Sequence, residues 1–192
     1  MNTKILAVAI LASGLAVSVV QAVPVATTTF GGHTYELFAA SGISWADAET
    51  AAVADGGYLA VLTTSAEATA VYGVLINNGF FQQTGGTSVE AWLGATPAVG
   101  TSTTDPTNWK WVDGEAWTAF DVGNFANGEP NGDPNSGLAI NRYGSFAFND
   151  EGGIVGGYIV EIPSVPDGGL TALLLGVGLI GVGTFRRTAK VG

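Results

Sequence analysis

Residues 128–150 read Gly-Glu-Pro-Asn-Gly-Asp-Pro-Asn-Ser-Gly-Leu-Ala-Ile-Asn-Arg-Tyr-Gly-Ser-Phe-Ala-Phe-Asn-Asp. The first part is too rich in glycine, proline, asparagine and aspartate for a helix or a central strand, so it predicts an ordered loop. The second part, from Leu138 to Phe148, alternates apolar and polar residues and predicts a strand pair. Two polar residues, Asn149 and Asp150, follow directly.

Four side chains of this stretch carry oxygens of the kind that Ca²⁺ binds. They are two carboxylates and two amides, from Glu129, Asn131, Asn149 and Asp150. Proteins usually surround Ca²⁺ with about six to eight such hard oxygen ligands. Glu129 precedes a proline, and an X-Pro bond adopts the cis form at modest cost. A cis bond here would direct the flanking side chains toward one ion.

The two clusters resemble the Glu-Pro-Asn and Trp-Asn-Asp motifs of C-type lectin-like domains. Asn131 and Asn149 lie eighteen positions apart, as the corresponding asparagines of that family do. Phe148 replaces the usual tryptophan, and Gly137 stands where the family has a third acidic ligand. Asp133, inside the loop, is the candidate replacement for that ligand.

The resemblance implies a function for the site. Its Ca²⁺ ligands would be Glu129, Asn131, Asn149 and Asp150, with Asp133 as a possible fifth, and sugar hydroxyls would complete the shell of the ion. The Glu-Pro-Asn order is similar to the mannose-type site and differs from the galactose-type Gln-Pro-Asp. The small number of carboxylates predicts weak binding, with a dissociation constant of about 10⁻⁴–10⁻³ M.

Further motifs of the same family follow in order between Thr27 and Pro163. The segments that resemble them are Ser44–Ala48, Gly57–Ala60, Ala91–Gly94, Trp109–Gly114 and Tyr158–Glu161. The resemblance implies an α+β, C-type lectin-like fold, with two helices, two small antiparallel sheets and a long irregular ligand loop. We expect Trp92 and Trp111 to lie in its core, because large aromatic residues in short strands are usually buried. The sequence leaves Trp109 open between the core and a binding surface.

Local patterns support the two helices independently. Ser44 can cap the first helix, and the second has Thr64 and Glu67 in a capping-box arrangement. Apolar residues then recur at helical spacing, in the first helix at 45, 48 and 52 and in the second at 68, 71, 72 and 75. Residues 33–38 predict an opening strand, and Gly31-Gly32 predicts a turn.

Charge and composition exclude several classes of function. The net charge is −10, and between residues 23 and 165 only Lys110 and Arg142 oppose fifteen acidic residues. Such a surface repels phosphate backbones, so we expect no nucleic-acid partner. Cysteine is absent and His33 is the only histidine, so neither disulfides nor a Cys–His pair can form. We predict that the protein is not an enzyme; a hydrolase that uses paired carboxylates, such as Glu115 and Asp121, is the alternative.

Both termini resemble export signals. Residues 1–22 combine a short basic start, an apolar run and a small-residue cleavage step, which predicts a signal peptide. Residues 164–192 contain Val-Pro-Asp-Gly-Gly, a short apolar run that predicts a transmembrane segment, and a basic tail. This segment resembles the PEP-CTERM class of bacterial sorting signals, closest to its Val-Pro-Asp-Ser-Gly variant. The resemblance implies an exosortase-type processing enzyme as a partner; an ordinary tail anchor is the alternative.

Together these patterns predict three segments: a signal peptide (1–22), a binding domain (23–163) and a sorting signal (164–192). We expect an exported bacterial protein at the cell surface or in the extracellular matrix, held in the membrane at least before processing. Its predicted ligand is a glycan or exopolysaccharide. Two alternatives keep the fold without sugar binding: recognition of a protein or a surface, and a structural role in the envelope or matrix.

Overall fold

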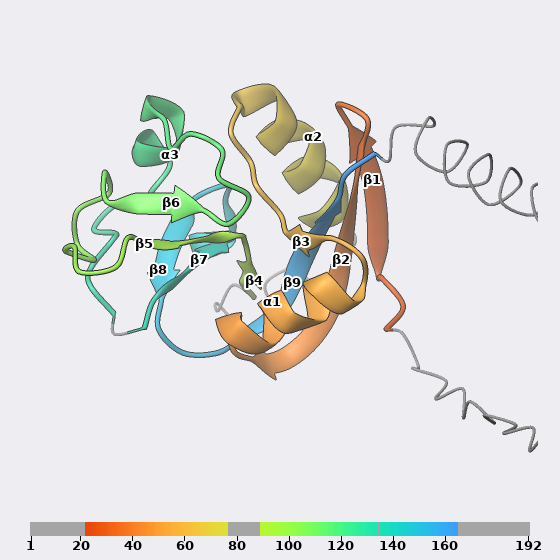
Figure 1. Ribbon diagram of the computed structural model, residues 1–192, viewed down its shortest axis with the longest axis horizontal. Coiled ribbons are helices and arrows are strands. Elements are labelled where there is room, and N and C mark those ends of the chain that lie inside the picture. The colour runs from red at the N-terminus through yellow and green to blue at the C-terminus, as the bar shows by residue number, and fades with distance from the viewer. Residues whose placement is uncertain (1–21, 77–88, 134, 165–192) are drawn as a thin grey trace, which may run out of the picture.

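The computed structural model describes residues 22–76, 89–133 and 135–164 (Figure 1). Except for Ala22 and Ser164, the predicted signal peptide and sorting signal lie outside these residues. None of the helices in the described ranges is both long and apolar enough to cross a bilayer.

One mixed sheet organises the described residues. The strands are β1 (Ala26–Phe30), β2 (His33–Ile43), β3 (Tyr58–Leu59), β4 (Ala91–Trp92), β5 (Ala95–Pro97), β6 (Trp109–Trp111), β7 (Gly137–Ile140), β8 (Phe148–Glu151) and β9 (Val155–Ile162). In the main sheet the order is β1-β2-β9-β4-β7-β8, and β3 also pairs with β9. All pairs in this sheet are antiparallel except β4 with β9. β5 and β6 form a separate antiparallel pair.

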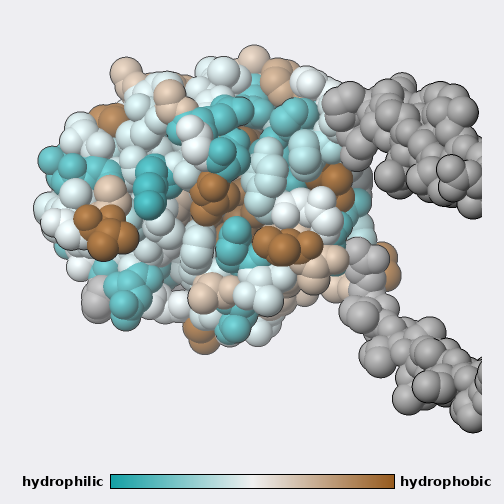
Figure 2. Space-filling model, viewed as in Figure 1, coloured by the Kyte–Doolittle hydropathy of each residue, from teal (hydrophilic) through white to brown (hydrophobic). Residues whose placement is uncertain are grey.

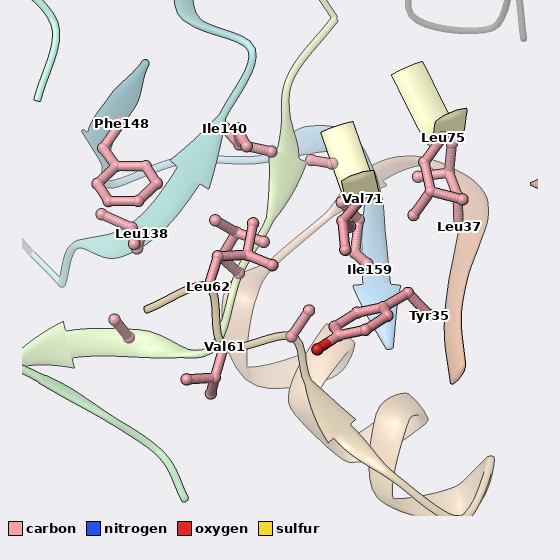
Figure 3. Close-up of a cluster of buried hydrophobic side chains, with 14 of the residues drawn as sticks. Tyr35, Leu37, Val61, Leu62, Val71, Leu75, Leu138, Ile140, Phe148 and Ile159 are labelled. Carbon is pink, nitrogen blue, oxygen red and sulfur yellow. The ribbon is translucent and has the colours of Figure 1, made fainter. Parts of the chain in front are cut away.

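The helices α1 (Trp45–Ala54) and α2 (Ser65–Leu75) cover opposite faces of this sheet (Figure 1). Successive residues of β9 point to opposite faces, so Ile159 joins the core beneath α2 while Tyr158 and Val160 join the core beneath α1. Figure 3 shows the first of these cores, in which Val71 and Leu75 of α2 pack against residues of β2 and β9. The predicted buried faces of both helices are confirmed at Ala48, Ala52, Ala68, Val71 and Leu75.

The side-chain caps predicted at Ser44 and Thr64 are confirmed. The carboxylate of Glu67, however, accepts the backbone N–H of Thr63 and not that of Thr64, so the second half of the predicted capping box was wrong. The hydroxyl of Ser44 accepts a hydrogen bond from the backbone N–H of Asp47, and that of Thr64 accepts one from Glu67. The predicted turn at Gly31-Gly32 joins β1 to β2, and both glycines have positive φ. Trp92 and Trp111 are buried, as expected of core residues, and Trp109 is buried as well.

The predicted α+β class is confirmed, but the prediction of two helices and two small antiparallel sheets was wrong in three details. A short third helix, α3 (Ala119–Gly123), has its own capping box between Thr118 and Asp121. The main sheet is larger and mixed, because β4 pairs in parallel with β9. The strand pair predicted over 138–148 is interrupted by a 3₁₀ turn, η2 (Arg142–Gly144), and its second strand continues to Glu151.

The apolar residues on the surface are dispersed. In the view of Figure 2 they lie singly among polar residues. Over the described part of the chain the exposed large aliphatic residues include Val23, Val53, Val99 and Ile154, which lie in separate segments of the chain. Single exposed apolar residues of this kind are normal for a globular domain and mark no interface.

The packing of α1 against β7 explains why position 137 holds glycine and not an acidic residue. A Cβ added to Gly137 would lie 2.1 Å from Cδ1 of Trp45, the first residue of α1. The indole of Trp45 is held in place by a 2.9 Å hydrogen bond from its Nε1 to the carbonyl of Leu93. A side chain at position 137, acidic or otherwise, therefore has no room, because α1 packs directly on the backbone of β7.

We predict that Gly137→Ala destabilises the domain by about 1–3 kcal/mol, because the added methyl group overpacks the contact with Trp45. Gly73→Ala is the matched control: it makes the same chemical change in α2, where an added Cβ meets nothing within 4 Å. The control should be neutral or stabilising by about 0.5–1 kcal/mol. Urea denaturation of both variants measures the difference, and equal stabilities would contradict the packing argument.

Candidate functional site

A buried carboxylate anchors the loop that follows α3. Asp150 on β8 is fully buried, and its Oδ1 accepts the backbone N–H of Asn131 at 2.8 Å. Its Oδ2 accepts the N–H groups of Gly132 at 2.7 Å and Asp133 at 3.2 Å. The bond between Glu129 and Pro130 is cis. The loop thus approaches β8 through its backbone, with both oxygens of Asp150 engaged.

The segment before the loop is bound to the same strand. The backbone N–H of Ala126 donates to the carbonyl of Phe148, whose own N–H donates to the carbonyl of Asn124. The ring of Phe125 lies 6.0 Å from that of Phe148 and 5.5 Å from that of Trp109. Phe125 therefore packs at the base of the loop, and residues 124–126 and 131–133 are bound to β8.

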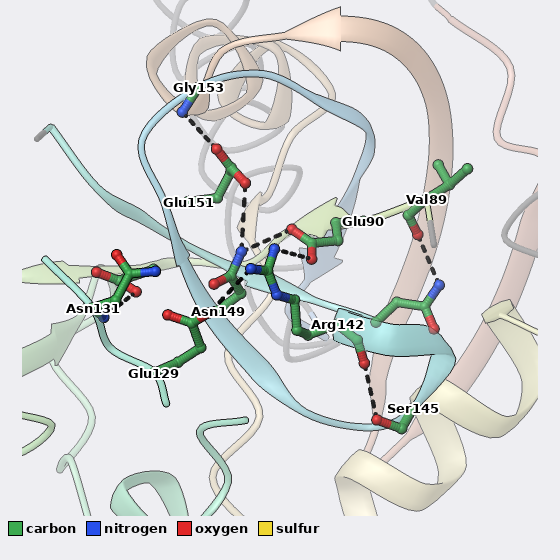
Figure 4. A network of polar contacts seen from close by, with 11 residues as sticks. Val89, Glu90, Glu129, Asn131, Arg142, Ser145, Asn149, Glu151 and Gly153 are labelled. Atoms are coloured by element: carbon green, nitrogen blue, oxygen red, sulfur yellow. Dashed lines mark hydrogen bonds and ion pairs between the residues drawn. The ribbon is translucent and has the colours of Figure 1, made fainter. Parts of the chain in front are cut away.

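A charged network lies beside this anchor (Figure 4). Arg142 donates from Nη2 to Glu129 Oε1 at 3.0 Å and from Nη1 to Glu90 Oε1 at 3.3 Å. Asn149 donates from Nδ2 to Glu90 Oε2 at 3.1 Å and, more weakly, to Glu151 Oε2 at 3.4 Å. The network joins the loop, β8 and the residue before β4, three segments distant in sequence.

The predicted site residues occupy different positions in this arrangement. Glu129 and Asn149 are brought together through Arg142 and Glu90. Asp150 lies next to them but holds the loop backbone, while the side chain of Asn131 is exposed. Asp133 contributes its backbone N–H to Asp150. The two segments therefore lie side by side, but Asp150 contacts the backbone of the loop and not the side chains of Glu129 and Asn131 as a shared ligand set would require.

Glu90, Arg142 and Glu151 belong to this network but were not among the predicted site residues. Arg142 carried a usable signal, since it is one of two basic residues among fifteen acids between residues 23 and 165. A lone arginine next to a cluster of oxygen ligands usually pairs with carboxylates. Glu90 carried none, because its contact with Asn149 depends on the pairing of β4 with β7 and of β7 with β8.

Two oxygens of the network lack a partner. Within the described part of the chain, Glu129 Oε2 and Asn149 Oδ1 are buried and accept no hydrogen bond of ordinary geometry. Buried polar atoms are nearly always satisfied, so each orphan requires an explanation such as a water molecule or an ion. One oxygen comes from each of the two clusters that the sequence singled out.

Negative charge at the site is only partly compensated. Burial raises the pKa of Glu129, and the neighbouring carboxylate of Asp150 raises it further, while Arg142 opposes both effects. Burial also raises the pKa of Glu90 in spite of its bonds to Asn149 and Arg142. The negative charge of these two carboxylates is therefore not fully neutralised by Arg142, and a further cation would stabilise it.

The donor set fits a hard divalent cation in its chemistry: a carboxylate oxygen and an amide oxygen, both without partners, in a negatively charged surrounding. The number of side chains that could bind the ion is small. No three Asp, Glu, His or Cys side chains in the described ranges are grouped so as to hold a metal ion. Any ion here would need backbone carbonyls, water or ligand oxygens to complete its shell, which agrees with a weak site.

We predict that Asp150→Asn destabilises the domain by about 2–3 kcal/mol, because one oxygen that accepts backbone N–H groups becomes an N–H₂ donor. Amide hydrogen exchange at residues 131–133 should become faster, and the opening free energy derived from it should fall by the same amount. Asp133→Asn is the matched control, since it removes the same charge from the loop that Asp150 holds and should change stability by less than about 0.5 kcal/mol. Unchanged protection in Asp150→Asn would contradict the anchoring role.

We also predict that Glu90 and Glu129 make the stability in a metal-free buffer fall as the pH rises above about 4.5. The folded-state pKa values of Glu90 and Glu129 lie above the ordinary 4.5, so the folded chain keeps protons that the unfolded chain releases. Their contribution is complete below about pH 4.5 and is lost as the pH rises through the raised values. Urea denaturation at about pH 5 and pH 8 measures the slope. Glu90→Gln should flatten it; an equal slope in wild type and variant would refute the assignment.

Comparisons with known proteins agree with this architecture. No protein-family profile matches the chain, and no curated protein matches its sequence. Solved structures do match. The C-type lectin domain of murine dendritic cell inhibitory receptor 2, in complex with N-glycan, has a TM-score of 0.54 at 19% identity, over 74% of this chain and 99% of that one.

Two further structures are similar to the same extent. SPL-1, in complex with GlcNAc, gives a TM-score of 0.52 at 19% identity, over 71% of this chain and 91% of its own. The Ca²⁺-dependent type II antifreeze protein, in its Ca²⁺-free form, gives 0.54 at 20% identity, over 72% and 98%. At these identities the likeness is one of fold, and the chain has the fold of a C-type lectin-like domain.

Proposed function

We propose that this domain binds glycans through the loop at residues 128–136 and the adjoining strand β8, with Ca²⁺ as a weakly held cofactor. The observation that carries the proposal is the pair of buried oxygens, Glu129 Oε2 and Asn149 Oδ1, that accept no hydrogen bond within the described residues. One belongs to each predicted cluster, and a hard cation satisfies both.

The chain's own residues have distinct roles in this proposal. Asp150 fixes the loop backbone, so that Glu129 and Asn131 are held in place before a ligand arrives. Glu129 and Asn149 would hold the ion, and the exposed Asn131 would contact both the ion and the sugar. A bound Ca²⁺ supplies a Lewis-acidic centre with free positions for two vicinal hydroxyls. Asp133 is a further possible ligand from the same loop.

Carbohydrate as the class of ligand has support from two sources. The Glu-Pro-Asn order in the loop is similar to that of mannose-type sites. Two proteins of the same fold, SPL-1 and the murine receptor domain, are described in complex with GlcNAc and with N-glycan. A non-enzymatic role is consistent with these relatives in fold, and His33, which bonds Glu161, belongs to β2 and not to the loop.

We also propose that the domain acts outside the cytoplasmic membrane, as an exported surface or matrix protein of a bacterium. This rests on residues 1–22 and 164–192, whose patterns resemble a signal peptide and an exosortase-type sorting signal. A glycan or exopolysaccharide of the cell envelope is then the ligand within reach.

We predict Ca²⁺-dependent glycan binding that is lost in Glu129→Gln, a variant that keeps the side chain's size but removes its carboxylate. The measurement is a glycan panel that includes mannosides, with and without chelator, on the full chain in mild detergent because of its apolar C-terminal run. Glu115→Gln removes the same charge from an exposed residue outside the site and is the matched control. It should bind as wild type does.

Three other outcomes each decide a different part. Binding that survives chelation refutes the cofactor but keeps the glycan. A rise in melting temperature with Ca²⁺ but no glycan binding leaves a lectin-like domain that recognises a protein or a surface. If neither ligand has any effect, the structural role in the envelope or matrix is the one that remains.

A further inference from the structure

Arg142 introduces a permanent positive charge into the candidate site. Its guanidinium lies between the carboxylates of Glu90 and Glu129, at 3.3 Å and 3.0 Å, as Figure 4 shows. The side chains of these two acids are 8% and 4% exposed, whereas that of Arg142 is 27% exposed. The cation therefore reaches in from the surface and contacts two acids that are almost completely buried.

The position of Arg142 is set by the residue before it. Asn141 adopts a left-handed conformation with φ of 82°, which asparagine tolerates better than most residues. Its side chain accepts a hydrogen bond from the Tyr72 hydroxyl at 2.7 Å and donates to the carbonyl of Val89 at 2.7 Å. The turn is thus attached both to α2 and to the segment that carries Glu90, so Arg142 starts from a fixed backbone.

The contacts of Arg142 coincide with those that a divalent ion would need. It donates to Oε1 of Glu129, whose other oxygen is one of the two orphans. It also neutralises Glu90, which in turn accepts a hydrogen bond from Asn149. An arginine keeps its charge at any physiological pH, so this cation is not removed by titration.

We propose that Arg142 is the internal counter-cation of this site: it holds Glu129 and Glu90 in place without metal and competes with a divalent cation for Glu129. The second half rests on the proposed function, whereas the first half is independent of it. Two positive centres that share one carboxylate repel each other, so the guanidinium weakens any Ca²⁺ site at Glu129.

The test compares Arg142→Met, which keeps the length of the side chain without its charge, with wild type. Ca²⁺ alone is the probe, titrated by calorimetry into the full chain in mild detergent, and thermal melting in chelator is the second readout. Lys110→Met is the matched control, because Lys110 is the other basic residue between 23 and 165 and is exposed on β6. Arg142→Met should bind Ca²⁺ at least about tenfold more tightly and melt at a lower temperature in chelator; Lys110→Met should do neither.

The two readouts separate this inference from the proposed function. Equal Ca²⁺ affinity in wild type and Arg142→Met overturns the competition while the proposed Ca²⁺ site stands. If no variant binds Ca²⁺, the cofactor is lost from the proposed function and melting in chelator decides: a loss specific to Arg142→Met supports the counter-cation, and equal melting overturns it. If Arg142→Met fails to fold in chelator, Arg142→Lys replaces it, because lysine keeps the charge. The melting temperature of Arg142→Lys should then be below that of wild type. A melting temperature equal to that of wild type would contradict the need for the paired guanidinium contacts.

Discussion

The interaction on which this architecture depends is the acceptance of three consecutive backbone N–H groups by the single carboxylate of Asp150. The loop that it holds is rich in glycine, proline and asparagine, and ordering such a loop costs about 1–2 kcal/mol per residue in backbone entropy. No cysteine is available to restrain it. A buried, charge-assisted cluster of hydrogen bonds takes over that restraint, because each bond to an ionised acceptor is stronger than a neutral one.

This anchoring divides the acids of the site into two kinds. Asp150 is saturated by the backbone, so its charge is already shared among three donors. Glu129 and Glu90 have buried side chains, and among the described residues Arg142 is the cation that pairs with both; burial raises the pKa of both acids. The first kind fixes geometry, and the second leaves a local field that attracts cations. The ordering by Asp150 matters for the proposed binding role, because a ligand loses affinity if it must first order the loop.

Sequence reasoning reached the parts of this structure that depend on local chemistry. The caps at Ser44 and Thr64 follow from side chains acting within one turn, and the approach of the Glu-Pro-Asn segment to β8 follows from a motif with fixed spacing. Contacts that depend on the register of strands distant in sequence could not be predicted from the sequence. The approach of Glu90 to Asn149 is one, and the indole of Trp45 against Gly137 is another. β1 was also missed, because Ala26–Phe30 is mostly threonine and lies at the edge of the sheet, where the apolar alternation of a strand is weak.

Arg142 gives the candidate site a positive charge that belongs to the chain itself. In a domain with fifteen acids and two bases between residues 23 and 165, a buried pair of glutamates without a cation would be strongly disfavoured. Arg142 removes much of that penalty permanently, whereas an ion from solution removes it only at sufficient concentration. The loop can therefore remain assembled when no ion is bound, and an arriving ligand meets an ordered surface. The same charge lowers the affinity for an ion, so order without ligand and tight metal binding oppose each other at Glu129.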